Sequence, residues 1–197
     1  MRITAAFALA FSISAASAFA QAPAAPPAPL PMVLTSTAFP DGGMIPLKYS
    51  QAQPGTAPGE GTSPALSWSN VPPAAKSLVL HMRDLEGVRN KTTEDQLHWL
   101  VWGMKPTVTS LAEGAPKGAK LPDGSYQVSA TGQVYRGPGA PAAGPLHHYM
   151  FEIYALDTEL NVEPTADMFE TRAKVLAAMQ GHVIGKAVYG GLFKRPN

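Results

Sequence analysis

The chain contains 197 residues with 15 basic and 14 acidic side chains, no cysteine, and a formal net charge of +1. The near-neutral charge argues against a nucleic-acid partner, which would need a basic face, and gives no support for electrostatic docking on a membrane. The lack of cysteine excludes a disulfide framework and a cysteine-linked lipid anchor, so stability must come from a hydrophobic core.

The start of the chain has the features of a secretory signal peptide. A single arginine precedes an apolar run, and the small residues Ala18 and Ala20 form a cleavage site. The run is too short and too rich in alanine and serine for a membrane span that is retained. We therefore predict a signal peptide at 1–20, a Pro/Ala-rich tether at 21–31 and one domain at 32–197. The mature protein should be periplasmic or secreted, with no transmembrane segment.

From Met32 onward, short extended segments alternate with turn residues. The three clearest strands are the longest apolar segments, Ser77–Asp84, Leu97–Met104 and His147–Leu156. The second of these is apolar on both faces, which predicts a place in the middle of a sheet. Shorter strand candidates are Val33–Phe39, Ile45–Tyr49 and the Pro-interrupted segment Ser63–Trp68.

Strict alternation assigns the side chains of a strand to two faces. In the second long strand, it places His98, Leu100, Trp102 and Met104 on one face and Leu97, Trp99 and Val101 on the other. In the third long strand, it places on one face His147, Tyr149, Phe151 and Ile153.

The clear helical pattern comes late in the chain. An apolar stripe at helical spacing is formed by Met168, Val175, Leu176 and Met179, and Gly181 follows as a stop signal. A run of strands followed by one or two helices is typical of a mainly β or α+β domain with helices near one edge.

The segment Tyr135–Tyr149 joins a Gly/Pro loop to two histidines. Proline lacks an N–H group and glycine is costly in regular elements, so this composition predicts an ordered loop. Consecutive N–H groups of such a loop can point into one concavity and hold an anion. The loop residues are Gly137, Pro138, Gly139, Ala140 and Pro141.

Polar residues stand at the ends of the three long strands, namely Asp84, His98 and His147. If these strands are neighbours, their ends converge on one rim. Two imidazoles and the loop N–H groups then offer donors to a phosphate or carboxylate, while the aspartate can orient one imidazole. The common nucleotide-binding and hydrolase motifs, G-x-G-x-x-G, G-x-S-x-G and H-E-x-x-H, are absent from the sequence.

The order of motifs resembles the phosphatidylethanolamine-binding protein family, specifically its bacterial Raf-kinase-inhibitor-like branch. LTSTAFPDGGMIPLKYS and SPALSWSNVPPAAKSLVL are similar to its opening strands, and LHWLVWGM to its H-W strand. YRGPGAPAAGPLHHYMFEIYALD resembles its G-P-x-x-P to H-R-Y signature, and GHVIGKAVYGGLFKR its C-terminal end. The similarity covers about residues 33–194, which is nearly the whole mature chain.

The resemblance implies a β-sandwich with a large central antiparallel sheet, a smaller second sheet and peripheral C-terminal helices. It also implies a small pocket for anionic groups such as phosphate or a phospholipid head group. Carried over by position, the ligand-binding residues are Asp84, His98, Gly137, Pro138, Gly139, Pro141, His147 and Tyr149, with Tyr189 from the tail.

The sequence departs from the family pattern at several of these positions. Aligned without a gap, Met82 and Arg83 stand at the first Asp-Pro of the family's D-P-D-A-P motif, and Glu86 stands at its last proline. His148 replaces the arginine of H-R-Y, and Ala140 replaces a loop proline. The loss of one carboxylate should reduce repulsion toward an anion, and strand alternation predicts that Arg83 faces away from the pocket.

Three functions remain open from the sequence. The first is a non-catalytic module that binds a small anionic ligand or lipid head group, with no cofactor. The second is a protein-interaction or inhibitor module that uses rim loops such as Gly87–Gln96. The third is a hydrolase with His98 or His147 as general base and Asp84 as its orienting group, although no nucleophile can be named. A metal site formed by Asp84, His98 and His147 is possible by ligand type, but these residues lack the local spacing of such sites.

Overall fold

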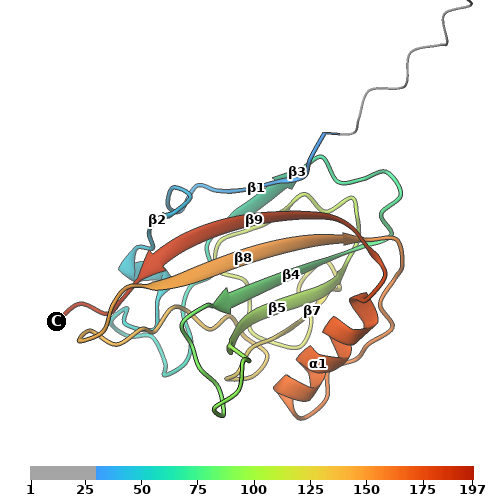
Figure 1. Cartoon of the computed structure of the whole chain (residues 1–197). Coiled ribbons are helices and arrows are strands. Elements are labelled where there is room, and N and C mark those ends of the chain that lie inside the picture. The colour runs from blue at the N-terminus through green and yellow to red at the C-terminus, as the bar shows by residue number, and fades with distance from the viewer. Residues whose placement is uncertain (1–29) are drawn as a thin grey trace, which may run out of the picture.

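A computed structural model describes residues 30–197 of the chain. Its strands form two sheets (Figure 1). The small sheet has the order β1 (Val33–Ser36), β3 (Leu66–Ser69), β6 (Ser110–Leu111). The large sheet has the order β2 (Gly43–Met44), β9 (Val183–Phe193), β8 (His147–Leu156), β4 (Ser77–Asp84), β5 (Gln96–Met104), β7 (Tyr126–Val128). All pairs are antiparallel except β2 with β9.

The architecture is the predicted mainly β fold, with a large sheet, a smaller sheet and little helix. Besides a short 3-10 helix at Leu47–Tyr49, the described residues contain one α-helix, α1 (Met168–Met179). It begins after Asp167, whose side chain accepts hydrogen bonds from the N–H groups of Phe169 and Glu170. The last strand, β9, runs without interruption through the final motif of the chain, GHVIGKAVYGGLFKR, from Val183 to Phe193.

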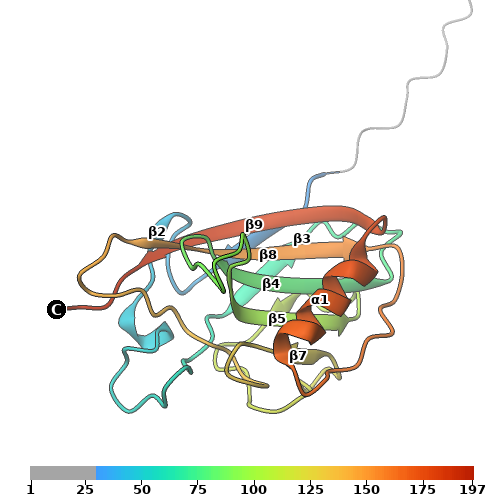
Figure 2. The same cartoon turned by 60° about the horizontal axis from the view of Figure 1, so that its bottom comes forward.

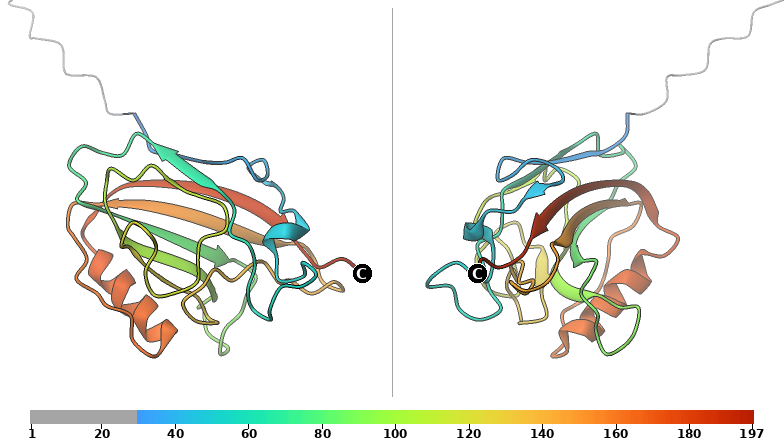
Figure 3. Two further views of the ribbon diagram at one scale, coloured as in Figure 1. Left: turned by 180° about the vertical axis from the view of Figure 1, so that it is seen from behind. Right: turned by 60° about the vertical axis from the view of Figure 1, so that its left-hand side comes forward.

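The large sheet buries both of its faces, which explains why its long strands are apolar throughout. One face packs toward the small sheet around Met82, Trp99 and Phe151. Seen from behind (Figure 3), that face is covered by β3 and the neighbouring loops. The other face packs under α1, where Val175 and Met179 meet Leu100 and Trp102; Figure 2 shows the helix lying across this face.

The predicted face assignment of β5 is confirmed from Trp99 to Trp102 but is wrong for Leu97 and Met104, because the strand does not alternate strictly near its two ends. Its register against β4 shifts twice, once between Met82 and Arg83 and once between Leu78 and Val79. Gly103 has a φ of 77°, a backbone conformation that glycine adopts without strain, and it lies at the second shift. The result is that Trp99, Val101 and Met104 share the core toward the small sheet, and Leu97, Leu100 and Trp102 share the core under α1. For β8, the predicted face with Tyr149, Phe151 and Ile153 is confirmed.

The predicted signal peptide at 1–20 and nearly all of the tether at 21–31 lie outside the described residues. Within residues 30–197, no helix has both the length and the apolar character needed to cross a membrane.

Candidate ligand-binding site

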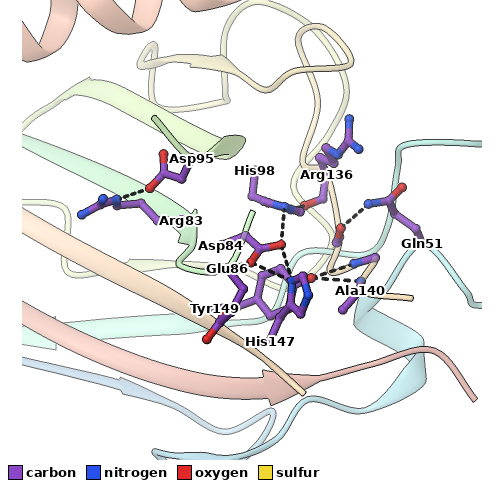
Figure 4. Close-up of polar contacts among 12 residues, drawn as sticks. Gln51, Arg83, Asp84, Glu86, Asp95, His98, Arg136, Ala140, His147 and Tyr149 are labelled. Carbon is purple, nitrogen blue, oxygen red and sulfur yellow. Dashed lines mark hydrogen bonds and ion pairs between the residues drawn. The ribbon is translucent and has the colours of Figure 1, made fainter. Parts of the chain in front are cut away.

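The polar strand ends meet because β4 lies between β5 and β8 and runs antiparallel to both. The end of β4 is therefore beside the beginnings of the other two strands. Asp84, the last residue of β4, pairs with Tyr149 of β8 and with Gln96 of β5. Asp84 and His98 are buried, and His147 is partly exposed. Figure 4 shows these side chains converging on the Asp84 carboxylate.

His147 is held by Asp84 through one ring nitrogen. Its Nδ1–H donates to both carboxylate oxygens, at 2.9 and 3.0 Å. This bond fixes the orientation of the ring, so Nε2 is the nitrogen that remains for another partner. The His147 side chain is 16% exposed and Asp84 only 7%, so the imidazole forms the outer layer of the pair.

His98 plays a different part, because its ring is enclosed. Its Nδ1–H donates to the Arg136 carbonyl at 3.0 Å, and the Arg136 N–H donates back to the His98 carbonyl at 3.0 Å. Burial lowers the pKa of His98 to about 4, a shift that the Arg136 carbonyl and the Asp84 charge oppose. Nε2 of His98 lies 3.8 Å from an Asp84 oxygen, which is beyond hydrogen-bond distance. The neutral ring therefore has no free N–H for an anion, unlike the prediction that both imidazoles would donate.

Tyr149 connects this cluster to the Gly/Pro loop. Its hydroxyl oxygen accepts hydrogen bonds from the N–H groups of Gly139 and Ala140, both at 3.1 Å. Burial raises the pKa of Tyr149, and the charge of Asp84 raises it further. The ring packs edge-on against His98 and nearly parallel to His147, with centroid distances of 5.1 and 6.3 Å.

The Gly/Pro loop is ordered as predicted, but its N–H groups already have partners. Those of Gly139 and Ala140 serve Tyr149, and that of Gly137 donates to the Glu60 carbonyl at 3.4 Å. The expectation that these groups point into an open concavity is therefore wrong. Pro138 accepts a hydrogen bond from the Gln51 N–H through its carbonyl.

Two of the predicted ligand-binding residues, Pro141 and Tyr189, lie apart from the cluster around Asp84. Pro141 is exposed at the end of the loop. Tyr189 is buried in β9, and its hydroxyl donates to the Phe39 carbonyl, so its polar group is directed to the segment after β1. The interactions found for Tyr189 do not connect it to Asp84 or the histidines.

Arg83 points to the opposite face of the sheet from Asp84, as strand alternation predicted, and pairs there with Asp95.

Glu86 belongs to the cluster although sequence reasoning did not select it. Its carboxylate accepts from the His148 N–H at 2.7 Å and from His148 Nδ1–H at 2.6 Å. Glu86 stands at the last proline of the D-P-D-A-P motif and His148 at the arginine of H-R-Y, so two residues that depart from the family motifs pair with each other. Asp84, Glu86 and His147 also offer ligand atoms within 4.8 Å of one another, a spacing that could hold a metal ion. The third member of this set is Glu86, and not His98 as the sequence had suggested.

The fold and the cluster define a single β domain with a histidine–carboxylate site at the ends of its central strands. A sequence model described as phosphatidylethanolamine-binding protein matches residues 35–194. The chain therefore belongs to the phosphatidylethanolamine-binding protein family, as its motifs predicted.

Individual relatives agree with this assignment. A UPF0098 protein from Methanothermobacter thermautotrophicus is 42% identical over 83% of this chain and 99% of its own length. A solved phosphatidylethanolamine-binding protein homologue from Chlamydia trachomatis is 36% identical, with a TM-score of 0.66 over 84% of this chain and 98% of that one. Escherichia coli YbcL is 27% identical, with a TM-score of 0.69 over 84% of this chain and 99% of that one.

Proposed function

We propose that the protein is an exported, non-catalytic binding module that takes a small anionic group, such as a phosphate, a carboxylate or a phospholipid head group, at His147. The observation that carries the proposal is the hydrogen bond from His147 Nδ1 to Asp84, which leaves the opposite side of a partly exposed imidazole available. Family membership supports a binding role.

The bonding pattern specifies the protonation state in which this site would bind an anion. A neutral imidazole has one N–H group, and His147 uses it for Asp84. A second N–H on Nε2 exists only in the protonated ring. Anion binding should therefore be accompanied by protonation of His147, with His98 and Tyr149 holding the surrounding geometry.

Titration with inorganic phosphate and with phosphoethanolamine, followed by NMR of the histidine rings, tests the proposal. Saturable shifts of His147, accompanied by smaller shifts of His98, are expected. His182 is a matched internal control, because its Nδ1 also pairs with a carboxylate, that of Asp157 at 2.8 Å, but in an exposed position. Lack of response at His147, or an equal response at His182, would refute the proposal.

A protein-interaction role has one specific observation in its favour. The loop between β4 and β5 exposes two apolar side chains, Leu85 at 53% and Val88 at 72%, next to the histidine–carboxylate site. Replacing both by serine should leave phosphate binding unchanged and abolish capture of a protein partner if the loop is a docking element. Retention of that partner by the double variant would argue against this second role.

A hydrolytic role has less support among the described residues. The hydrogen bonds of the His98 and His147 rings go to the Arg136 carbonyl and to Asp84, and no serine or threonine hydroxyl bonds to either ring. An activity that disappears in both His98→Ala and His147→Ala would nevertheless revive it.

A further inference from the structure

The opposite face of the large sheet carries a second polar cavity. It has a volume of about 320 Å³ and lies between the sheet, α1 and the loop that connects β4 to β5. Figure 2 shows this loop and α1 in front of the same face. The sheet contributes His81 and Arg83, the loop contributes Asp95, and the helix contributes Arg172 and Leu176.

His81 is a buried polar residue without a partner at this cavity. Its side chain lies in the middle of β4 and is only 4% exposed, and among residues 30–197 its Nε2 has no hydrogen-bond partner. Burial lowers its pKa to about 4, although Asp95 and Glu152 oppose the shift, so the ring is neutral near pH 7. A buried nitrogen without a partner is costly, so His81 is an unsatisfied polar residue in the wall of the cavity.

The charged groups around the cavity form one connected network. Asp95 bonds Arg83 through one carboxylate oxygen and Arg172 through the other, at 3.0 Å for Arg172. Glu152 is bonded by Lys186 at 2.6 Å and by the Tyr154 hydroxyl at 3.0 Å.

Glu94 completes this network, with its Oε2 lying 2.8 Å from Arg89 and 3.3 Å from Arg172. The network thus joins four cations, Arg83, Arg89, Arg172 and Lys186, to three carboxylates, Glu94, Asp95 and Glu152. The network as a whole therefore carries one positive charge in excess, although the cavity itself is lined by two of the cations, Arg83 and Arg172, and by all three carboxylates.

Arg83 lines the cavity and has N–H groups without a hydrogen-bond partner among the described residues. Its Nε is bonded to Asp95, whereas its Nη1 is 3.7 Å from Glu152, too far for a hydrogen bond. The Arg83 side chain is 38% exposed, so its Nη groups are accessible. A guanidinium with free N–H groups is suited to a carboxylate, and Leu176 and Ala173 supply an apolar wall beside it.

We propose that this cavity is a second ligand site, which binds a small monocarboxylate with a short apolar tail through Arg83 beside His81. The carboxylate would accept hydrogen bonds from the Nη groups of Arg83, and the tail would lie against α1. The site is separate from the histidine–carboxylate site, since Arg83 and Asp84 point to opposite faces of β4.

Butyrate is a suitable probe, with butyramide as its neutral analogue and butylammonium as its cationic one. NMR of the His81 ring and the Arg83 Nε–H should show saturable shifts with butyrate and about tenfold weaker binding of butyramide, as expected for loss of a charged hydrogen bond. The titration is repeated in His147→Ala, because butyrate could also bind at the first site. Shifts confined to His147, or equal affinities for butyrate and butyramide, would overturn the inference.

Substitutions on α1 test the location without disturbing the ion pairs of the sheet. Ala173 lines the cavity, so Ala173→Trp should block butyrate and weaken its binding about tenfold or more. Lys174→Trp places the same bulk on the next residue, which does not line the cavity, and this variant should bind butyrate normally. Unchanged binding in Ala173→Trp would place the ligand elsewhere.

Substitutions of Arg83 test the group that binds the carboxylate. Arg83→Lys, which keeps the charge, should retain part of the butyrate affinity that Arg83→Gln loses.

Discussion

His147 is the residue at which the proposed anion site can be separated from its alternatives. Sulfate keeps its double charge across the useful pH range, so any pH dependence of its binding comes from the protein. Because only the doubly protonated ring can donate both to Asp84 and to an anion, sulfate affinity should fall as pH rises. Isothermal titration at several pH values should show a dependence that His147→Gln removes and His182→Gln leaves intact. A pH-independent affinity in the unmodified protein would contradict this mechanism.

Two buried histidines should make the fold sensitive to acid. Burial lowers the pKa of both His81 and His98 from 6.5 to about 4. Below the ordinary pKa, the unfolded chain takes up protons that the folded chain does not, so stability falls as pH drops from about 6.5 toward 4. Each ring should cost roughly 1.5 kcal/mol of unfolding free energy between pH 6.5 and pH 5.

Urea denaturation at these two pH values measures this loss. His81→Leu should remove about half of the loss that these two rings cause, whereas His182→Leu, at an exposed position, should leave it unchanged. An identical pH dependence in His81→Leu and the unmodified protein would show that the His81 ring does not contribute.

The sequence predicted the main cluster residues but not all their hydrogen bonds. Asp84, His98 and His147 could be selected because polar side chains at the ends of apolar strands are conspicuous. Glu86 could not, since it lies in the loop after β4, where alternation gives no orientation. The use of the loop N–H groups by Tyr149 depends on a contact between two elements, which local composition does not reveal.

At the scale of the elements, the Gly/Pro loop depends on one close backbone approach. A Cβ added at Gly137 would lie 2.6 Å from the Tyr49 carbonyl oxygen and 2.8 Å from the Ser50 carbonyl carbon, and neither backbone atom can move easily. At Gly139 the added Cβ would instead meet the end of the flexible Gln51 side chain at 2.5 Å. Gly137→Ala should therefore destabilise the protein by about 1–3 kcal/mol and weaken phosphate binding, and Gly139→Ala should have a smaller effect.

Thermal denaturation and phosphate titration of the two glycine variants form the comparison. Equal effects of Gly137→Ala and Gly139→Ala would show that the close approach of the loop to Tyr49 does not determine its conformation. Adding Gln51→Ala to Gly139→Ala should restore the stability that Gly139→Ala loses, because the side chain that obstructs the added methyl group is then removed.

The strand β5 shows why faces are harder to predict than strands. Its apolar sequence predicted its existence and its interior position, both of which the structure confirms. The two register shifts against β4 are set by pairing with a neighbour, and each one exchanges the faces of the residues beyond it. The same amino-acid sequence is therefore compatible with more than one assignment of its side chains to the two faces of the sheet.

At the scale of the whole molecule, the large sheet separates two polar sites. One gathers Asp84 and His147 where the strands end, and the other gathers Arg83 and His81 under α1. The overall fold could be predicted because several motifs occur in the family's order along nearly the whole mature chain. The second cavity could not, since its lining comes from β4, β8, α1 and a loop that are distant in sequence.

Export is the part of the proposed function that concerns the whole chain. Signal peptidases require small residues at the two positions that Ala18 and Ala20 occupy. Expressed in a bacterium with its full sequence, the protein should accumulate outside the cytoplasm with Gln21 as its first residue, as measured by cell fractionation and N-terminal sequencing. Ala20→Arg should block processing, whereas Ala24→Arg, beyond the cleavage site, should not. Unprocessed protein that remains in the cytoplasm would contradict export, while the two ligand sites could still be tested in solution.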